Sequence, residues 1–193
     1  MNNMNENSKG IDNSDSNEID AAIKGKTNKE IFDLGIYRGD VKLVQLGLDA
    51  GVDPAAFNNL AIREASEDGY NDVVELLLKD SRVDPTANSY YAIHLAAMKG
   101  HDKVVDLLLK HPMIDPTSKD FYGIQWAADY GNYNVVELLL KDGRADPTSW
   151  DNWAIRRAAK YDLKDLVKLL LDDKRVWVTL TQNHRKEYSE MIK

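Results

Sequence analysis

A block of sequence recurs along this chain every 31 residues, and this repeat constrains the fold more than any other feature. The dipeptide Asp-Pro begins at positions 53, 84, 115 and 146. The same interval relates the segments 61–66, 92–97, 123–128 and 154–159, and also the Val/Leu-rich segments 73–78, 104–109, 135–140 and 166–171. A fifth, more divergent copy comes first, where 39–48 matches 69–78. Three blocks that keep one register over four copies indicate a repeat protein.

Each unit contains two short helical patterns. In the third unit, Ile93, Ala96 and Ala97 form the small-residue face of a first helix, which Gly100 ends. Glycine is favoured there because the end of a helix often needs left-handed backbone. The equivalent positions hold Gly39, Gly69, Gly131 and, in the last unit, Asp162, whose departure suggests a frayed or specialised end.

The second helix of the third unit has one apolar stripe, formed by Val104, Val105, Leu108 and Leu109 and widened by Leu107. A pair of helices this short cannot bury such a stripe alone. Stacked pairs can, so we expect each unit to be held by its immediate neighbours.

These blocks resemble ankyrin repeats, and 92–109 is the clearest copy. The T-P-L-H-x-A pattern of that family survives as the hexapeptide 91–96, in which Tyr91 and Ala92 replace the threonine and the proline and His94 is kept. The resemblance covers about residues 28–176. It implies an all-α solenoid of about five helix–turn–helix repeats, near 28–56, 57–87, 88–118, 119–149 and 150–176.

The units are shorter than the usual 33 residues, and the difference lies between one second helix and the next first helix. The same register of every unit holds a residue of the helix-capping type: Asn28, Asn58, Ser89, Asp120 and Asp151. We expect these side chains to accept a hydrogen bond at the start of the first helix. The first helix would then begin about two residues early, and the projecting finger would shrink to a tight turn around each Asp-Pro.

The two ends of the array differ from its middle. Residues 1–17 are polar and acidic, and we expect them to be disordered or loosely packed. The array is expected to span 18–176, with a short helix at 18–23 and a capping box at Thr27–Glu30 that starts the regular stacking. Residues 177–193, with a polar helix from 183, are expected to form a C-terminal capping segment.

Composition excludes several classes of protein. The chain has no cysteine, so disulfides and thiolate metal sites are ruled out. The net charge of −7 shows no basic face for nucleic acid, and no stretch approaches the roughly 20 apolar residues of a membrane span. Residues 1–20 lack the apolar run of a signal peptide. We expect a cytoplasmic protein, in a host cell if it comes from a virus or an intracellular microbe.

No constellation of residues indicates catalysis, a cofactor or a metal. The four histidines, His94, His101, His111 and His184, have no metal-binding spacing, and the first two fall where ankyrin repeats use histidine for structural hydrogen bonds. Phosphate loops and nucleophile motifs are absent from the sequence. We therefore expect no enzyme and no cofactor.

Binding is expected on the concave side that ankyrin-like stacks form from their turns and first helices. The positions before each glycine should look outward, and they vary while the framework repeats: Tyr37 and Arg38, Glu67 and Asp68, Met98 and Lys99, Asp129 and Tyr130, Lys160 and Tyr161. A third variable position holds Leu34, Glu64, Leu95, Trp126 and Arg157.

Aromatic residues near the turns add Tyr90, Phe121 and Trp150 to this set, because exposed Tyr and Trp commonly anchor interfaces. Packing between repeats remains the alternative for Tyr90, Phe121, Trp126 and Tyr130. Leu60, Tyr91, Tyr122 and Trp153 share one register and are assigned to packing.

The function expected is a non-catalytic module, monomeric, that binds a partner protein on this face. Two alternatives stay open. One is a structural or self-associating scaffold that pairs through an end face, and the other is an adaptor that uses its C-terminal tail.

Overall fold

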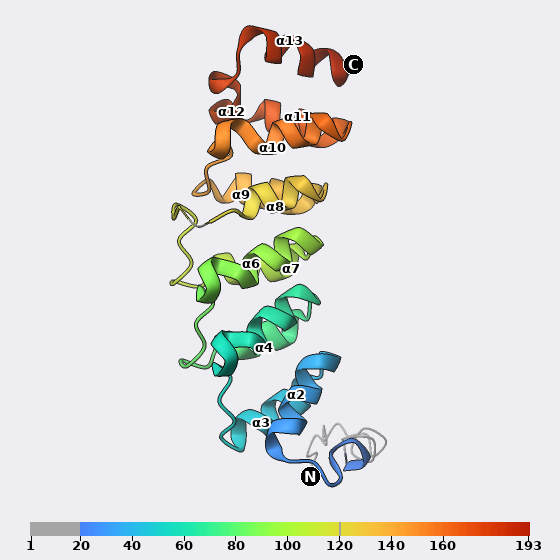
Figure 1. The fold of residues 1–193 in the computed structure, drawn as a ribbon, viewed down its shortest axis with the longest axis vertical. Helices are drawn as coiled ribbons and strands as arrows, with labels where there is room; N and C mark the ends of the chain where they lie inside the picture. Colours follow the sequence, from blue (N-terminus) through green and yellow to red (C-terminus); the bar gives the residue numbers. More distant parts are fainter. Residues whose placement is uncertain (1–19, 120) are drawn as a thin grey trace, which may run out of the picture.

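A computed structural model describes residues 20–119 and 121–193 of the chain. Within these residues the backbone forms helices and turns with no strand, stacked from one end of the molecule to the other (Figure 1). The helices are α2 (Asn28–Arg38), α3 (Val41–Asp49), α4 (Ala56–Glu67), α5 (Asn71–Leu78), α6 (Ala87–Lys99), α7 (Asp102–Leu109), α8 (Gly123–Asp129), α9 (Tyr133–Asp142), α10 (Ser149–Lys160), α11 (Lys164–Asp172), α12 (Lys174–Thr179) and α13 (Gln182–Met191).

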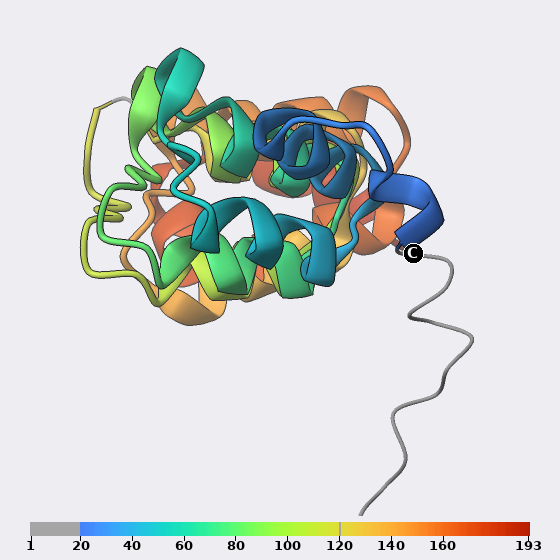
Figure 2. The ribbon, with the colours of Figure 1, turned by 90° about the horizontal axis from the view of Figure 1, so that it is seen from below.

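Helices α2 to α11 form five antiparallel pairs. The first helices α2, α4, α6, α8 and α10 pack on one another in order, and the second helices do the same in a second layer. Viewed along the stack, the connecting loops project from one side (Figure 2). The predicted all-α solenoid of five helix–turn–helix repeats is confirmed.

The core runs through the stack between the two layers. Ile93, Ala96 and Ala97 of α6 are fully buried, as the small-residue face predicts. Val104, Val105 and Leu108 of α7 are also fully buried, and the equivalent residues of the second, fourth and fifth repeats lie in the same continuous cluster. Each apolar stripe is thus covered by the pair of helices before it and the pair after it.

The loops between repeats are tight turns built on aspartate. In three of them the Asp side chain accepts two hydrogen bonds from the threonine two residues later: Thr86 N–H and Oγ1 donate to Asp84 at 2.8 and 2.6 Å. The same pair of bonds recurs at Asp115–Thr117 and Asp146–Thr148. The side chain replaces the partner strand that a longer finger would supply, because it mimics a backbone turn. The predicted shortening of the fingers is confirmed in the described residues.

The predicted capping role at the start of the first helices is wrong in the described repeats. Asn28 follows the true N-cap, Thr27, and Asp120 lies outside the described residues. In α4, α6 and α10 the residues concerned, Asn58, Ser89 and Asp151, sit in the middle of three consecutive left-handed residues. Asn and Asp are among the few residues that tolerate this conformation, so the same residue types serve a turn instead of a cap.

The left-handed turn directs its first and third residues differently. In α4 the first, Phe57, is 70% exposed, whereas the third, Asn59, is buried and its Oδ1 accepts the Asp84 N–H of the next loop at 2.7 Å. In α10, Trp150 is 54% exposed and Asn152 is buried, where its Oδ1 accepts the Thr179 hydroxyl at 2.8 Å. In these two repeats the turn therefore ties its repeat to the following segment and leaves an aromatic ring on the surface.

A contact at the glycines joins each repeat to the one before it. Gly69 has φ +74, and the ring of His101 from the next repeat lies against it while its Nε2 is 2.9 Å from the Glu67 carbonyl oxygen. Tyr70 lies in the same way against Gly39, Asn132 against Gly100 and Leu163 against Gly131. The left-handed glycines are as predicted. Asp162 adopts φ +55 at the equivalent place, so the helix end there has the ordinary geometry despite the missing glycine.

The ends of the stack are closed by shorter elements. Thr27 and Glu30 form the predicted capping box, in which the Thr27 N–H donates to Glu30 Oε2 at 2.7 Å. Residues 20–23 form a helical turn, while the predicted loose segment 1–17 and the first two residues of the expected helix at 18–23 lie outside the described residues. At the other end α13 packs on α11 and buries Tyr188.

The apolar stripe yields a test of the helix register. Leu108→Ala or Leu139→Ala should lower the free energy of unfolding by about 2–5 kcal/mol, because both side chains are fully buried and leave a cavity. Leu46→Ala is the matched control: its side chain is 43% exposed on α3, so the loss should stay near 0.5 kcal/mol. Urea titration measures all three. Similar losses at Leu108 and Leu46 would show that the stripe is placed wrongly.

The glycine contact yields a second test. Gly69→Ala and Gly143→Ala both place a side chain on left-handed backbone, at a cost of about 1–2 kcal/mol. A Cβ at Gly143 meets nothing within 4 Å, whereas one at Gly69 would lie 2.5 Å from His101 Nδ1. The Gly69 variant should therefore lose about 1–3 kcal/mol more, as His101 gives up its bond to Glu67. Equal losses in thermal unfolding would mean that the glycine serves only its own turn.

Candidate functional site: the first-helix face

Aromatic and charged side chains gather on the first helices of the fourth and fifth repeats. We call this the aromatic–arginine surface and define it by Trp126, Asp129 and Tyr130 at α8 and by Trp150, Trp153, Arg157 and Tyr161 at α10. Trp126 and Tyr130 are one helical turn apart, and their rings stack with centroids 6.4 Å apart and planes at 12°. Tyr130 is 60% exposed, so one face of this pair is open to solvent.

Asp129 connects the two helices of this surface. Its Oδ1 accepts hydrogen bonds from Arg157 Nε at 2.6 Å and from Trp153 Nε1 at 3.0 Å. The guanidinium of Arg157 also lies over the rings of Trp153, at 5.2 Å, and Tyr161, at 4.7 Å. The hydrogen bond to Asp129 raises the pKa of Arg157, which stays charged. These contacts fix the side chains in place, so little conformational freedom is left to lose on binding.

The exposed Trp150 is held by an arginine of its own helix. Arg156 Nη2 donates to the Trp150 carbonyl oxygen at 3.0 Å, and the Trp150 ring lies 4.7 Å from Tyr122 and 5.9 Å from Trp153. Three repeats earlier, Arg63 Nη2 donates to the Phe57 carbonyl oxygen at 3.1 Å. The same hydrogen bond, from an arginine to the carbonyl six residues before it, therefore holds an exposed aromatic residue near each end of the stack.

His94 of α6 lies against the rings of Phe121 and Tyr122 and has a structural role. It is buried, and its Nε2 accepts the Tyr122 backbone N–H from the next repeat at 2.9 Å. An acceptor nitrogen carries no proton, so the neutral ring has its proton on Nδ1. Burial lowers the pKa of His94 to about 4. The structural interpretation made from the sequence is confirmed, and His101 follows it through its bond to the Glu67 carbonyl.

The same face is acidic in the second repeat. Burial, followed by repulsion from Asp68 and Asp33, raises the pKa of the Glu64 carboxyl. Glu67 forms an ion pair with Lys99 of the third repeat at 3.5 Å. The face thus changes character along the stack, from carboxylates near the N-terminal end to aromatic rings and arginines near the C-terminal end.

Most of the residues predicted to bind a partner reach the surface. The exposed and half-exposed ones are Glu64, Glu67, Asp68, Met98, Lys99, Asp129, Tyr130, Trp150, Arg157, Lys160 and Tyr161, with Trp126 and Tyr90 more deeply set. Leu95 and Phe121 are each only 7% exposed and pack in the core, so they are removed from the candidate surface. Phe121 meets Tyr90 edge-on at 5.9 Å, which assigns both largely to packing between repeats.

For some residues the assignment made from the sequence differs from their place in the structure. Tyr91, assigned to packing, is 39% exposed, because the left-handed turn before it moves the start of the regular helix outward. Trp153 is half-buried, but its indole also supports Asp129 and Arg157. Phe57 is not among the residues predicted to bind a partner. It occupies the same repeat position as Trp150, and this shared position is the sequence feature that could have identified it.

Other kinds of site find no support in the part of the chain that the structure describes. Among residues 20–119 and 121–193, no three His, Asp or Glu side chains are grouped so that they could hold a metal ion. No helix of this described part is both long enough and apolar enough to cross a membrane.

Comparison with known families identifies the repeats. A family model described as ankyrin repeats in three copies matches residues 32–120, and a model of the single ankyrin repeat matches residues 124–152. Together they cover more than half of the chain. A comparison with curated proteins found no match.

The burial of His94 predicts a pH dependence of stability. With a pKa of about 4 when folded and about 6.5 when unfolded, the unfolded chain binds the proton more readily between these values. Stability should be full above pH 6.5 and fall by about 3 kcal/mol on acidification to pH 4. His94→Gln keeps an acceptor for Tyr122 and should lack this component. The measurement is urea unfolding of both chains at pH 7 and pH 4, and parallel losses would assign the acid sensitivity to carboxylates.

Proposed function

We propose that this chain, which belongs to the ankyrin repeat family, binds a partner protein through its first-helix face without catalysing a reaction. Ankyrin repeats are generally protein–protein interaction modules. The observation that carries the proposal is the aromatic–arginine surface, where Tyr130, Trp150 and Tyr161 are each about half or more exposed and yet held by fixed contacts. Aromatic rings and arginine are the residues that most often anchor interfaces.

The contrast with the rest of the molecule supports this face over others. The second helices α5, α7 and α9 carry lysine–carboxylate pairs four residues apart on their exposed sides, such as Lys79–Glu75 and Lys110–Asp106. Such pairs add little stability and keep a surface well solvated. The first helices of the fourth and fifth repeats instead expose rings that water solvates poorly, as expected of a surface that a partner covers.

His94 has no chemical role in the proposed function. The acceptor nitrogen of His94, Nε2, already accepts the Tyr122 N–H, and the ring is buried. A general base needs a nitrogen that can reach a substrate proton. We therefore assign His94 to the framework and the aromatic–arginine surface to binding.

The test is loss of partner capture. Trp126→Ala and Tyr130→Ala should each weaken binding by more than about 1 kcal/mol, typical of anchor residues. The helical circular dichroism should not change, because Tyr130 is 60% exposed and Trp126 lies at the edge of the core. Tyr133→Ala is the matched control, a tyrosine that is 38% exposed on the second-helix layer.

The measurement has two steps. Proteins captured from an extract of the source cells by the tagged chain are quantified by mass spectrometry, and the affinity of the recovered partner for each variant is then titrated. Equal loss in the Tyr133 variant would move the binding surface to the other layer. Unfolding of the Trp126 variant would place that ring in the core.

A further inference from the structure

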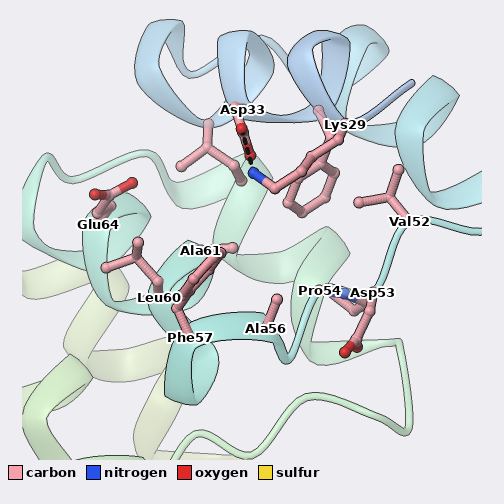
Figure 3. Close-up of a pocket in the computed structure, with 12 residues that line it drawn as sticks. Lys29, Asp33, Val52, Asp53, Pro54, Ala56, Phe57, Leu60, Ala61 and Glu64 are labelled. Carbon is pink, nitrogen blue, oxygen red and sulfur yellow. Dashed lines mark hydrogen bonds and ion pairs between the residues drawn. The ribbon is translucent and has the colours of Figure 1, made fainter. Parts of the chain in front are cut away.

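A hollow of about 280 Å³ lies between the first helices of the first two repeats (Figure 3). These helices, α2 and α4, are toward the opposite end of the stack from α10 and the aromatic–arginine surface (Figure 1). Its floor is apolar: Phe32 and Ile36 of α2 are buried there, and Pro54 closes the side toward the loop. The exposed ring of Phe57 and the carboxylates of Asp33 and Glu64 stand around it. An apolar floor with a few charged groups at its mouth is typical of a site for a mixed side chain or ligand.

The charge at this hollow is negative. Its lining contains the three carboxylates Asp33, Asp53 and Glu64 against one cation, Lys29. Within the described chain Glu64 is not in an ion pair, and Asp68 lies near enough to raise its pKa further, after burial. Arg63 donates a hydrogen bond to the Phe57 carbonyl oxygen, and its charge offsets only part of the rise in the pKa of Glu64. A cation with an apolar stem therefore complements both parts of the hollow.

Lys29 shows how such a cation would be held. Its ammonium lies 2.5 Å from Asp33 Oδ2 and 5.6 Å from the centre of the Phe57 ring, so it contacts a carboxylate and an aromatic face together. Both partners of the ion pair are more than half exposed. Exposed pairs of this kind contribute little free energy, so another cation can displace Lys29.

We propose that this hollow accepts a lysine or arginine side chain of a partner protein. The aliphatic stem would lie on Phe32 and Ile36, and the charged end would meet Asp33, Glu64 and the face of Phe57. The hydrogen bond from Arg63 to the Phe57 carbonyl fixes the left-handed turn that presents this ring, so the aromatic face is in place before binding. The inference rests on the proposed function in taking the cation from a protein, and it adds a basic residue to the description of that partner.

The probe for the test is Nα-acetyl-lysine methylamide with a free ε-ammonium. Nα-acetyl-norleucine methylamide has the same stem without the charge. Titration is followed by nuclear magnetic resonance, through the backbone amides of α2 and α4. We expect the lysine probe to shift these amides and to bind at least fivefold more tightly than the norleucine probe. The difference should shrink as salt is added, because the charges are close to solvent.

Variants of this chain separate the parts of the site. Asp33→Asn combined with Glu64→Gln should abolish the preference for lysine, and Lys29→Ala should tighten lysine binding several-fold by removing the competing ammonium. These positions are all exposed, and circular dichroism verifies that the fold is kept. The Trp126→Ala variant should bind the probe unchanged.

Failure of the preference for the lysine probe overturns the inference, and the effect of Trp126 on partner capture decides the proposed function separately. Equal binding of the two probes would mean an apolar hollow without a role for charge, and shifts elsewhere or none at all would mean that the hollow takes no basic side chain. Partner capture that depends on Trp126 while the lysine probe fails would leave the proposed function standing without this site. Binding of the lysine probe, with no effect of Trp126→Ala on partner capture, would leave the hollow as a site for a basic side chain and would contradict the proposed function of the aromatic–arginine surface.

Discussion

The structure depends on the contact that each repeat makes with the one before it. The residue just after the end of each first helix packs on the glycine that ends the first helix of the previous repeat: Tyr70 on Gly39, His101 on Gly69, Asn132 on Gly100 and Leu163 on Gly131. In three of these contacts a polar group also meets a backbone carbonyl of the earlier repeat, as in the two 2.7 Å bonds from Asn132 Nδ2 to Ala97 and Met98. This position accepts a phenol, an imidazole, an amide or an alkyl group, because any of these side chains can fill the space beside the glycine of the previous repeat, which has no Cβ.

These contacts fix the register of one helix pair on the next, and the register decides which positions can vary. Residues that touch both neighbours, such as Ala96 and Val105, have no exposed atoms and hardly change from unit to unit. Residues beside them on the first helix are mostly more exposed and vary from unit to unit. There the stack tolerates Glu64, Leu95, Trp126 and Arg157 in one register, and one of the four, Leu95, is still drawn into the core. A rigid framework thus carries a row of sites whose chemistry can be chosen separately.

The helices, their pairing, the left-handed glycines and the tight Asp-Pro turns follow from the sequence because each depends on residues within one repeat. The start of the first helix does not. Asn58 and Asp151 suit a helix cap and a left-handed turn equally well, and the choice is made by neighbouring elements: Asn59 must meet the backbone of Asp84, and Asn152 the hydroxyl of Thr179. Once the turn is left-handed, Tyr91 moves outward and Phe57 is presented to solvent, which no pattern within a single unit indicates. Tyr90 and Phe121 fill the same register as these asparagines, and their rings pack on each other edge-on with centroids 5.9 Å apart.

The difference between the two ends of the first-helix face gives a partner a direction. Phe57 and Trp150 occupy equivalent positions three repeats apart, and each is held by an arginine six residues later. Their surroundings differ, because Phe57 stands beside the carboxylates Asp33 and Glu64 whereas Trp150 stands beside Tyr122 and Trp153. A polypeptide lying along the face would meet a cation-accepting hollow at one end and a flat aromatic surface at the other. The same polypeptide bound in the opposite direction would place its basic side chain against Arg156 and leave the carboxylates unpaired. The differences between repeats on a common framework therefore favour one direction of binding.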